Sequence, residues 1–262
     1  MSETMTAAAV HVSGNGGDEI EAYVANPDGP PTRGGVVVIH HLPGYDRGSK
    51  EIVRRFAELG YDAICPNLYS RQAPGAAPEQ AARIVREQGG ISDEQLVGDV
   101  AGAAAYLRDL PTSNQKVGVI GYCSGGRQSV LAACTTDVDA AVDCYGAFVT
   151  GTPPEGFPLQ VGNLVGQLPD LRCPLLGLFG NDDSYPSPEQ VDEIEQILRA
   201  NDKTYEFHRY YDTGHAFGPV ETERYRKHAA ADGMTRISAF YGDHVRTRRP
   251  DDGGAGSSIG SR

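Results

Sequence analysis

Short apolar runs alternate with segments of helical periodicity along most of this chain. Residues 35–40 are rich in β-branched side chains and too few for a helix, so they predict a buried strand. Residues 50–59 carry apolar side chains at helical spacing, and Gly60 ends that segment. The alternation continues with strands predicted at 61–66, 116–122, 140–145, 174–180 and 204–210, and helices at 78–90, 93–110, 124–133, 188–200 and 221–241. Such alternation forms a doubly wound, mostly parallel sheet flanked by helices, so we predict an α/β fold.

The chain of 262 residues has the length of one α/β domain. Two further strands are predicted within 9–27, around the glycine-rich turn 14–17. No internal repeat is present, and we expect a single domain over residues 1–245. Residues 246–262 are rich in Gly and Ser and lack an apolar face, so they predict a disordered tail.

Charge and composition exclude several classes of partner. The formal net charge of -12 argues against nucleic acid, because phosphate binding needs a basic surface. No apolar run approaches the roughly 18 residues that cross a bilayer, and the first ten residues do not resemble a signal peptide, so we expect no membrane partner. The five cysteines form no CxxC pair, which argues against a disulfide framework or a structural zinc site. A reducing cytoplasm is the expected location.

The strand predicted at 116–122 runs directly into the sequence Gly121-Tyr122-Cys123-Ser124-Gly125-Gly126. A tight turn from strand to helix needs small residues beside it, and it lifts the central side chain above the sheet. Cys123 also lies where the next helix begins, and the free N–H groups and helix dipole there stabilise a thiolate. The pattern G-x-nucleophile-x-G therefore predicts that Cys123 is a nucleophile.

An acid and a histidine follow Cys123, each just after a predicted strand. Asp182 and Asp183 come after the strand at 174–180, and His215 comes after the strand at 204–210. The order nucleophile, acid, histidine is the one that hydrolases with this sheet use. His215 would accept the thiol proton, and one of the two aspartates would fix the imidazole tautomer.

Attack of Cys123 on an ester carbonyl would create an oxyanion and then an acyl-enzyme. Two backbone N–H groups are expected to receive the oxyanion: that of Ser124, directly after the nucleophile, and that of Leu42, in the loop after the early strand. A water activated by His215 would release the acyl group. The predicted ligand is a small-molecule ester or lactone substrate.

Four stretches resemble the dienelactone hydrolase (carboxymethylenebutenolidase) family of the α/β-hydrolase superfamily. They are CPNLYSRQAPG at 65–75, KVGVIGYC at 116–123, GNDD at 180–183 and GHAF at 214–217, and the resemblance extends from about residue 20 to 241. It implies the α/β-hydrolase fold, a catalytic triad of Cys123, Asp183 and His215, and no cofactor. The family pattern G-x-x-D selects Asp183 rather than Asp182.

Two positions depart from the family pattern. His41 stands where the family type has a glutamate that pairs with the resting cysteine, and Pro219 stands where it has an arginine that holds the substrate carboxylate. These departures concern the identity of the substrate more than the hydrolytic chemistry.

Other polar residues have two interpretations each. His41 either tunes the thiol or packs in its loop, whereas His40 is expected to be structural. Arg71 is a candidate for holding an anionic substrate, although loop arginines are usually solvated or ion-paired, and Arg127 is a candidate for lining the pocket. No helix-spaced His/Glu pair supports a metal site, so we expect no metal.

Other functions on this scaffold remain open from the sequence alone. The chain could be a carboxylesterase or thioesterase, or a haloacid dehalogenase. It could also be a catalytically silent protein of the same fold that binds a small ligand.

Overall fold

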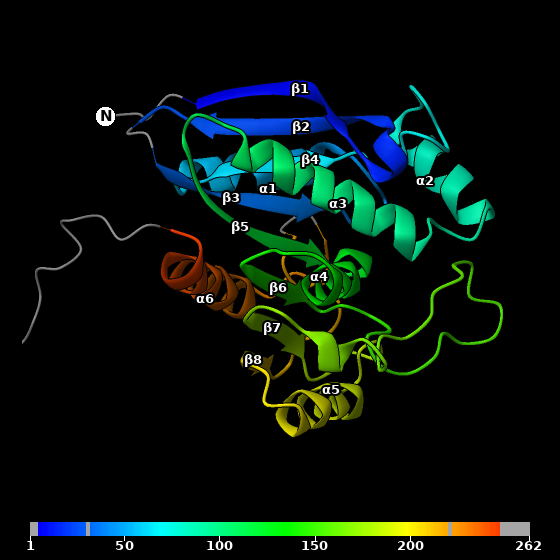
Figure 1. Cartoon of the computed structure of the whole chain (residues 1–262). Coiled ribbons are helices and arrows are strands. Elements are labelled where there is room, and N and C mark those ends of the chain that lie inside the picture. Colours follow the sequence, from blue (N-terminus) through cyan, green and yellow to red (C-terminus); the bar gives the residue numbers. More distant parts are fainter. Residues whose placement is uncertain (1–4, 30–31, 220–221, 247–262) are drawn as a thin grey trace, which may run out of the picture.

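Eight strands form one sheet at the centre of the protein (Figure 1) in a computed structural model that describes residues 5–29, 32–219 and 222–246. Their order in the sheet is β1-β2-β4-β3-β5-β6-β7-β8. β1 and β4 each pair antiparallel with β2, and every other neighbouring pair is parallel. The prediction of a mostly parallel sheet is confirmed. The strands are β1 (Met5–Ser13), β2 (Glu19–Pro27), β3 (Arg33–Ile39), β4 (Asp62–Pro66), β5 (Ser113–Tyr122), β6 (Ala140–Cys144), β7 (Leu175–Gly180) and β8 (Tyr205–Tyr210).

Helices cover both faces of this sheet. They are α1 (Arg47–Glu58), α2 (Pro78–Glu87), α3 (Asp93–Arg108), α4 (Ser124–Thr135), α5 (Pro188–Ala200) and α6 (Lys227–His244). Successive strand residues point to opposite faces, so Val37 packs in the core under α2–α5, whereas Val36 and Val38 pack in the core under α1 and α6. Apolar residues on both faces explain why the central strands are continuous hydrophobic runs.

Several predicted boundaries are wrong, among them the starts of α1 (Arg47, predicted at 50) and β5 (Ser113, predicted at 116), and two more have a clear physical reason. β1 begins at Met5 rather than at residue 9, because Ala7–Ala9 have little strand preference of their own but pair with β2 along its whole length. α6 begins at Lys227 rather than at 221, since the described residues before it form a loop and turn after His215. Residue 221 itself and the predicted tail from 247 onward lie outside the described residues. Arg246 is described, and its guanidinium donates a hydrogen bond to the Leu59 carbonyl.

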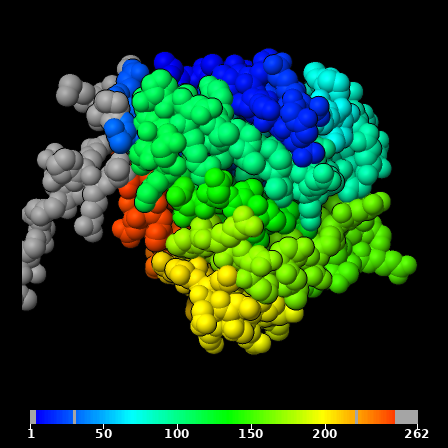
Figure 2. Space-filling model, viewed as in Figure 1, coloured from blue at the N-terminus to red at the C-terminus, as the bar shows by residue number. Residues whose placement is uncertain are grey.

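A long segment with little regular structure joins β6 to β7. Residues 145–174 contain only the short 3-10 turn Leu168–Asp170, and part of the segment projects at one side of the molecule (yellow-green in Figures 1 and 2). Sequence periodicity gave no indication of this excursion. It returns Ala147, Phe148 and Phe157 to the edge of the sheet where the parallel strands end.

The carboxyl ends of the parallel strands lie along this edge, where sheets of this kind usually bind ligands. The segments that follow β3, β5, β6, β7 and β8 carry Leu42, Cys123, Phe148, Asp183 and His215, respectively. Residues from distant parts of the chain thereby meet in one place. No described helix is both long and apolar enough to cross a bilayer.

Candidate active site

Cys123 occupies a strained turn between β5 and α4. Its backbone has φ 56° and ψ -121°, a conformation that L-residues adopt rarely and at a cost in energy. The turn closes because its neighbours are glycines: a Cβ on Gly121 would lie 1.8 Å from the Gly125 carbonyl oxygen, and one on Gly125 would lie 2.6 Å from the Ile39 carbonyl oxygen. The result is a partly exposed thiol, whereas the other four cysteines are buried.

His215 is held by Asp183. Its Nδ1 lies 2.7 Å from Asp183 Oδ2, and the other carboxylate oxygen accepts the Tyr185 N–H at 2.9 Å. The Asp183 side chain is only 3% exposed, whereas the neighbouring Asp182 is exposed. The structure therefore brings Asp183, and not Asp182, to the imidazole. With Nδ1 facing a carboxylate, Nε2 is the ring nitrogen left for another partner.

The protonated form of His215 is stabilised by its surroundings. Burial lowers the pKa of His215, but hydrogen bonds to Asp183 and Cys123, together with the negative charge on both, raise it to about 10. The Tyr145 ring packs edge-on against the imidazole, with the ring centroids 5.2 Å apart. Asp183 and Cys123 thus both favour the protonated form of the imidazole.

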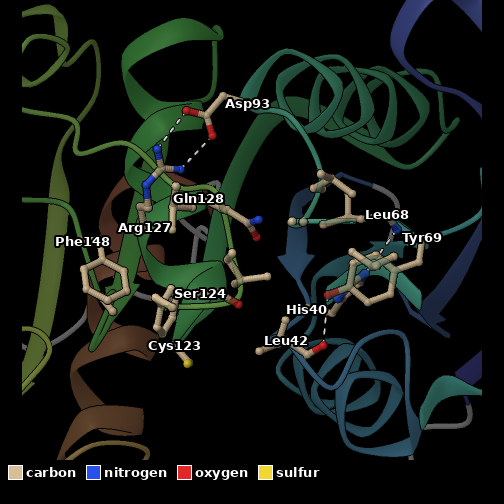
Figure 3. A pocket seen from close by; sticks show the side chains of 18 residues that line it. His40, Leu42, Leu68, Tyr69, Asp93, Cys123, Ser124, Arg127, Gln128 and Phe148 are labelled. Atoms are coloured by element: carbon tan, nitrogen blue, oxygen red, sulfur yellow. Dashed lines mark hydrogen bonds and ion pairs between the residues drawn. The ribbon is translucent and has the colours of Figure 1, made fainter. Parts of the chain in front are cut away.

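The two backbone N–H groups expected to receive an oxyanion belong to residues that line the same pocket as the thiol. Leu42, Cys123 and Ser124 all border it (Figure 3). Neither N–H has a hydrogen-bond partner within the part of the chain that the structure describes. The Leu42 loop is fixed by Tyr69, whose hydroxyl donates to the Leu42 carbonyl at 3.0 Å. Both donors are therefore available on a fixed backbone, which is the requirement for stabilising developing charge.

The pocket beside Cys123 is lined mainly by apolar side chains from three segments of the chain. The end of α2 and the loop after it contribute Val85 and Ile91, and Leu68 comes from the loop after β4. The excursion between β6 and β7 contributes most of the remaining wall: Ala147, Phe148, Phe157, Leu159 and Val161. Sequence analysis missed these residues as pocket residues, since all of them except Val85 on α2 lie in loops without hydrophobic periodicity.

Arg127 lines this pocket, but its charge is matched. The guanidinium is buried and donates to both carboxylate oxygens of Asp93, at 2.8 and 2.9 Å, and to the Gly162 carbonyl. Such a bidentate pair is among the stronger charge-assisted interactions. Across the described ranges, no group of three or more His, Cys, Asp or Glu side chains could hold a metal ion.

Comparison with known proteins identifies the family. The family model described as "Dienelactone hydrolase family" matches residues 20–245. The chain belongs to the dienelactone hydrolase family. The carboxymethylenebutenolidase of Pseudomonas putida is 31% identical over 232 residues, which cover 87% of this chain and 92% of the relative.

Solved structures of the dienelactone hydrolase type agree with this assignment. A Klebsiella pneumoniae protein named for the dienelactone hydrolases has a TM-score of 0.81 at 27% identity, covering 92% of this chain and 100% of that chain. A dienelactone hydrolase-like promiscuous phosphotriesterase from metagenomic libraries has a TM-score of 0.73 at 20% identity, covering 92% and 99%, and supports the fold alone.

At the position of the family glutamate, His41 pairs with Asp46 and is not among the described residues that line the pocket beside Cys123. Its Nε2 lies 3.1 Å from Asp46 Oδ2, and Asp46 Oδ1 accepts the Ser49 N–H at the beginning of α1. Burial raises the pKa of Asp46, but hydrogen bonds from His41 and Ser49 outweigh it and lower that pKa to about 2. His41 therefore supports a capping carboxylate, which favours the interpretation that it packs in its loop over the one in which it tunes Cys123.

His40 has a structural role within the same loop. It is buried, the Leu68 N–H donates to Nε2 at 3.2 Å, and Nδ1 lies 3.0 Å from the His41 carbonyl oxygen. Burial lowers the pKa of His40 to about 4. The ring is therefore neutral at pH 7 and protonated on Nδ1, since a carbonyl oxygen can only accept.

Arg71 does not line the pocket beside Cys123, which corrects its interpretation as a substrate contact. Its guanidinium spans the carboxylate of Asp99, at 2.9 and 3.0 Å, and also donates to Asp18 at 2.7 Å. Asp99 is fully buried, so its charge needs this partner. Within the family motif at 65–75, Arg71 therefore joins the first hairpin to α3.

Proposed function

We propose that this protein hydrolyses a small carboxylic ester or lactone, with Cys123 as nucleophile, His215 as general base and acid, and Asp183 as the residue that orients the imidazole. The observation that carries the proposal is that a strained, partly exposed thiol lines the same cleft as an imidazole whose Nδ1 is fixed by a buried carboxylate. Membership of the dienelactone hydrolase family supports the same reaction class. A reducing compartment such as the cytoplasm would keep the thiol reduced.

The chemistry follows from the roles of the three side chains. The thiolate sulfur attacks the carbonyl carbon, and the carbonyl oxygen becomes an oxyanion that the Leu42 and Ser124 N–H groups stabilise. As the oxyanion collapses, the bond to the leaving oxygen breaks and imidazolium Nε2 gives it a proton, leaving a thioester on Cys123. In a lactone the leaving oxygen stays attached to the acyl chain.

The second half of the reaction restores the enzyme. Neutral His215 takes a proton from water, and the resulting hydroxide attacks the thioester carbonyl. The carbon–sulfur bond breaks, the carboxylic acid leaves, and the thiolate again faces the imidazolium. Asp183 holds Nδ1–H throughout, so that Nε2 always faces the reacting atoms.

The proposal is tested with Cys123→Ala and Cys123→Ser on a panel of short-chain aryl esters, lactones and thioesters. We expect Cys123→Ala to lower kcat/KM by at least about 1000-fold, since the covalent step is removed. Iodoacetamide should alkylate Cys123 well before the four buried cysteines. Undetectable wild-type turnover across the panel would favour a silent ligand-binding protein, and halide release from haloacids would favour a dehalogenase.

A further inference from the structure

The charged and ionisable side chains that line the pocket beside Cys123 already have partners within the protein. Arg127 is paired with Asp93, and His40 is neutral, with both ring nitrogens engaged by backbone groups. No cation on the described lining of this pocket is therefore left to bind a substrate anion, because Arg224 and Arg226 border the separate cleft that Asp183 and His215 line on the other side of Cys123. A carboxylate buried there without a partner would pay a large desolvation penalty.

Gln128 is an uncharged polar side chain of the pocket wall that lacks a partner for one of its atoms in the described structure. It lies on the first turns of α4, and Figure 3 shows its side chain reaching from α4 toward the centre of the pocket. Its Oε1 is buried and has no hydrogen-bond partner in the described structure. A buried amide oxygen without a partner is uncommon and calls for an explanation, such as a ligand group that completes it.

The rest of the pocket wall is mainly apolar. Apolar side chains from the end of α2 and from the excursion between β6 and β7 surround the space beyond the thiol, among them Val85, Ile91, Phe148 and Leu159. A pocket of this kind binds apolar carbon chains, and its few polar groups set specificity.

We propose that the acyl group bound in this pocket is uncharged and mainly apolar, and that Gln128 Oε1 accepts a hydrogen bond from one neutral donor on it, such as a hydroxyl group. An amide donates and accepts equally well, which suits a neutral partner, whereas binding an anion needs a net positive charge. This inference rests on the proposed ester hydrolysis and specifies its substrate class.

Three para-nitrophenyl esters with six-carbon acyl chains test the proposal: the hexanoate, the 6-hydroxyhexanoate and the half-ester of adipic acid. We expect the adipic half-ester to have kcat/KM at least about 100-fold below that of the hexanoate, because its carboxylate enters without a cation. We expect Gln128→Leu to lower the ratio of kcat/KM for the hydroxy ester to that for the hexanoate about tenfold, since the hydrogen bond from the substrate hydroxyl to Gln128 Oε1 is lost. Gln196→Leu, at an exposed position on α5, is the matched control.

A charge change tests the pairing of Arg127 directly. Asp93→Asn keeps the shape of the side chain but leaves Arg127 with an unmatched positive charge on the pocket wall. We expect the ratio of kcat/KM for the adipic half-ester to that for the hexanoate to rise about tenfold. Glu94→Gln removes an equal charge from the adjacent, exposed position and should leave that ratio within about twofold.

Chloromethyl ketones that carry the hexanoyl or the adipoyl chain separate this inference from the proposed function, since they report entry to the pocket without turnover. The expected result is faster alkylation of Cys123 by the neutral ketone, even if no ester is hydrolysed and the proposed function fails. Hydrolysis or alkylation that is as fast with the carboxylate-bearing chain overturns the inference. An unchanged ratio of kcat/KM for the hydroxy ester to that for the hexanoate in Gln128→Leu overturns the role of Gln128.

Discussion

Replacing Asp183 with asparagine tests how His215 is controlled. Asp183 Oδ1 accepts the Tyr185 N–H, so the asparagine carbonyl oxygen will take that place and its NH₂ group will face His215 Nδ1. The amide then donates to Nδ1, which moves the ring proton to Nε2, the nitrogen that must take the thiol proton. The variant is nearly isosteric, so the fold should be kept while the tautomer is reversed.

The magnitude follows from the pKa of His215. Its rise from 6.5 to about 10 corresponds to about 5 kcal/mol in favour of the imidazolium. If the Asp183 contacts supply about half of that, their loss lowers kcat/KM roughly 30- to 100-fold, and the wrong tautomer reduces it further. We therefore expect Asp183→Asn to lower kcat/KM for a short-chain aryl ester by at least about 100-fold.

The neighbouring residue supplies the control. Asp182 is exposed and does not contact His215, so Asp182→Asn should change kcat/KM by no more than about threefold. Kinetics on the ester, with thermal unfolding to show that both variants are folded, complete the assay. The reasoning would be refuted by Asp183→Asn retaining activity, or by Asp182→Asn being the more damaging change.

Two further predictions concern His40 and Arg71, which have structural contacts in this protein. The folded-state pKa of His40 lies below 6.5, so the unfolded chain takes up this proton first as pH falls, and up to about 3 kcal/mol of stability is lost between pH 6.5 and pH 4. Urea unfolding of His40→Asn should show a shallower loss over that window, and an equal slope would contradict a neutral buried His40. Arg71→Leu should cost about 3 kcal/mol by leaving Asp99 buried and unpaired, with kcat/KM of the folded fraction kept within about threefold. A selective rise in KM for anionic esters would restore Arg71 as a substrate contact.

The strands and the tight strand-to-helix turn at Cys123 could be predicted because their sequence signals are local. The run at 116–122 and the glycines around Cys123 specify a strand, a tight turn and a helix within a dozen residues. Chain order then limited the acid to Asp182 or Asp183 and the base to His215. The residues alone left the two aspartates open, since burial of Asp183 depends on how the segment after β7 folds against the loop after β8.

The partners of polar side chains were not predictable in the same way. Arg71 and Asp99 lie 28 residues apart, and no local sequence pattern around either residue predicts that they pair. His41 and Asp46 are close in the chain, yet their contact depends on Asp46 capping α1, which the predicted helix start at residue 50 concealed. A loop charge can therefore be assigned to substrate only after buried carboxylates have been located.

The reacting groups of the site could be predicted from the sequence, whereas most residues of the pocket wall could not. The reacting groups sit at strand ends, where the sheet fixes their positions and the sequence pattern is strong. Much of the pocket wall comes from residues 145–167, where no periodicity constrains the sequence, and the rest comes in part from the end of α2 and the loop after it. The residues chosen there, such as Asp93 as the partner of Arg127 or Gln128 facing the acyl chain, determine which substrates enter the pocket. They do so without changing the tight turn at Cys123. Substrate class in this protein must therefore be inferred from the charge balance of the wall, and the catalytic motif alone does not determine it.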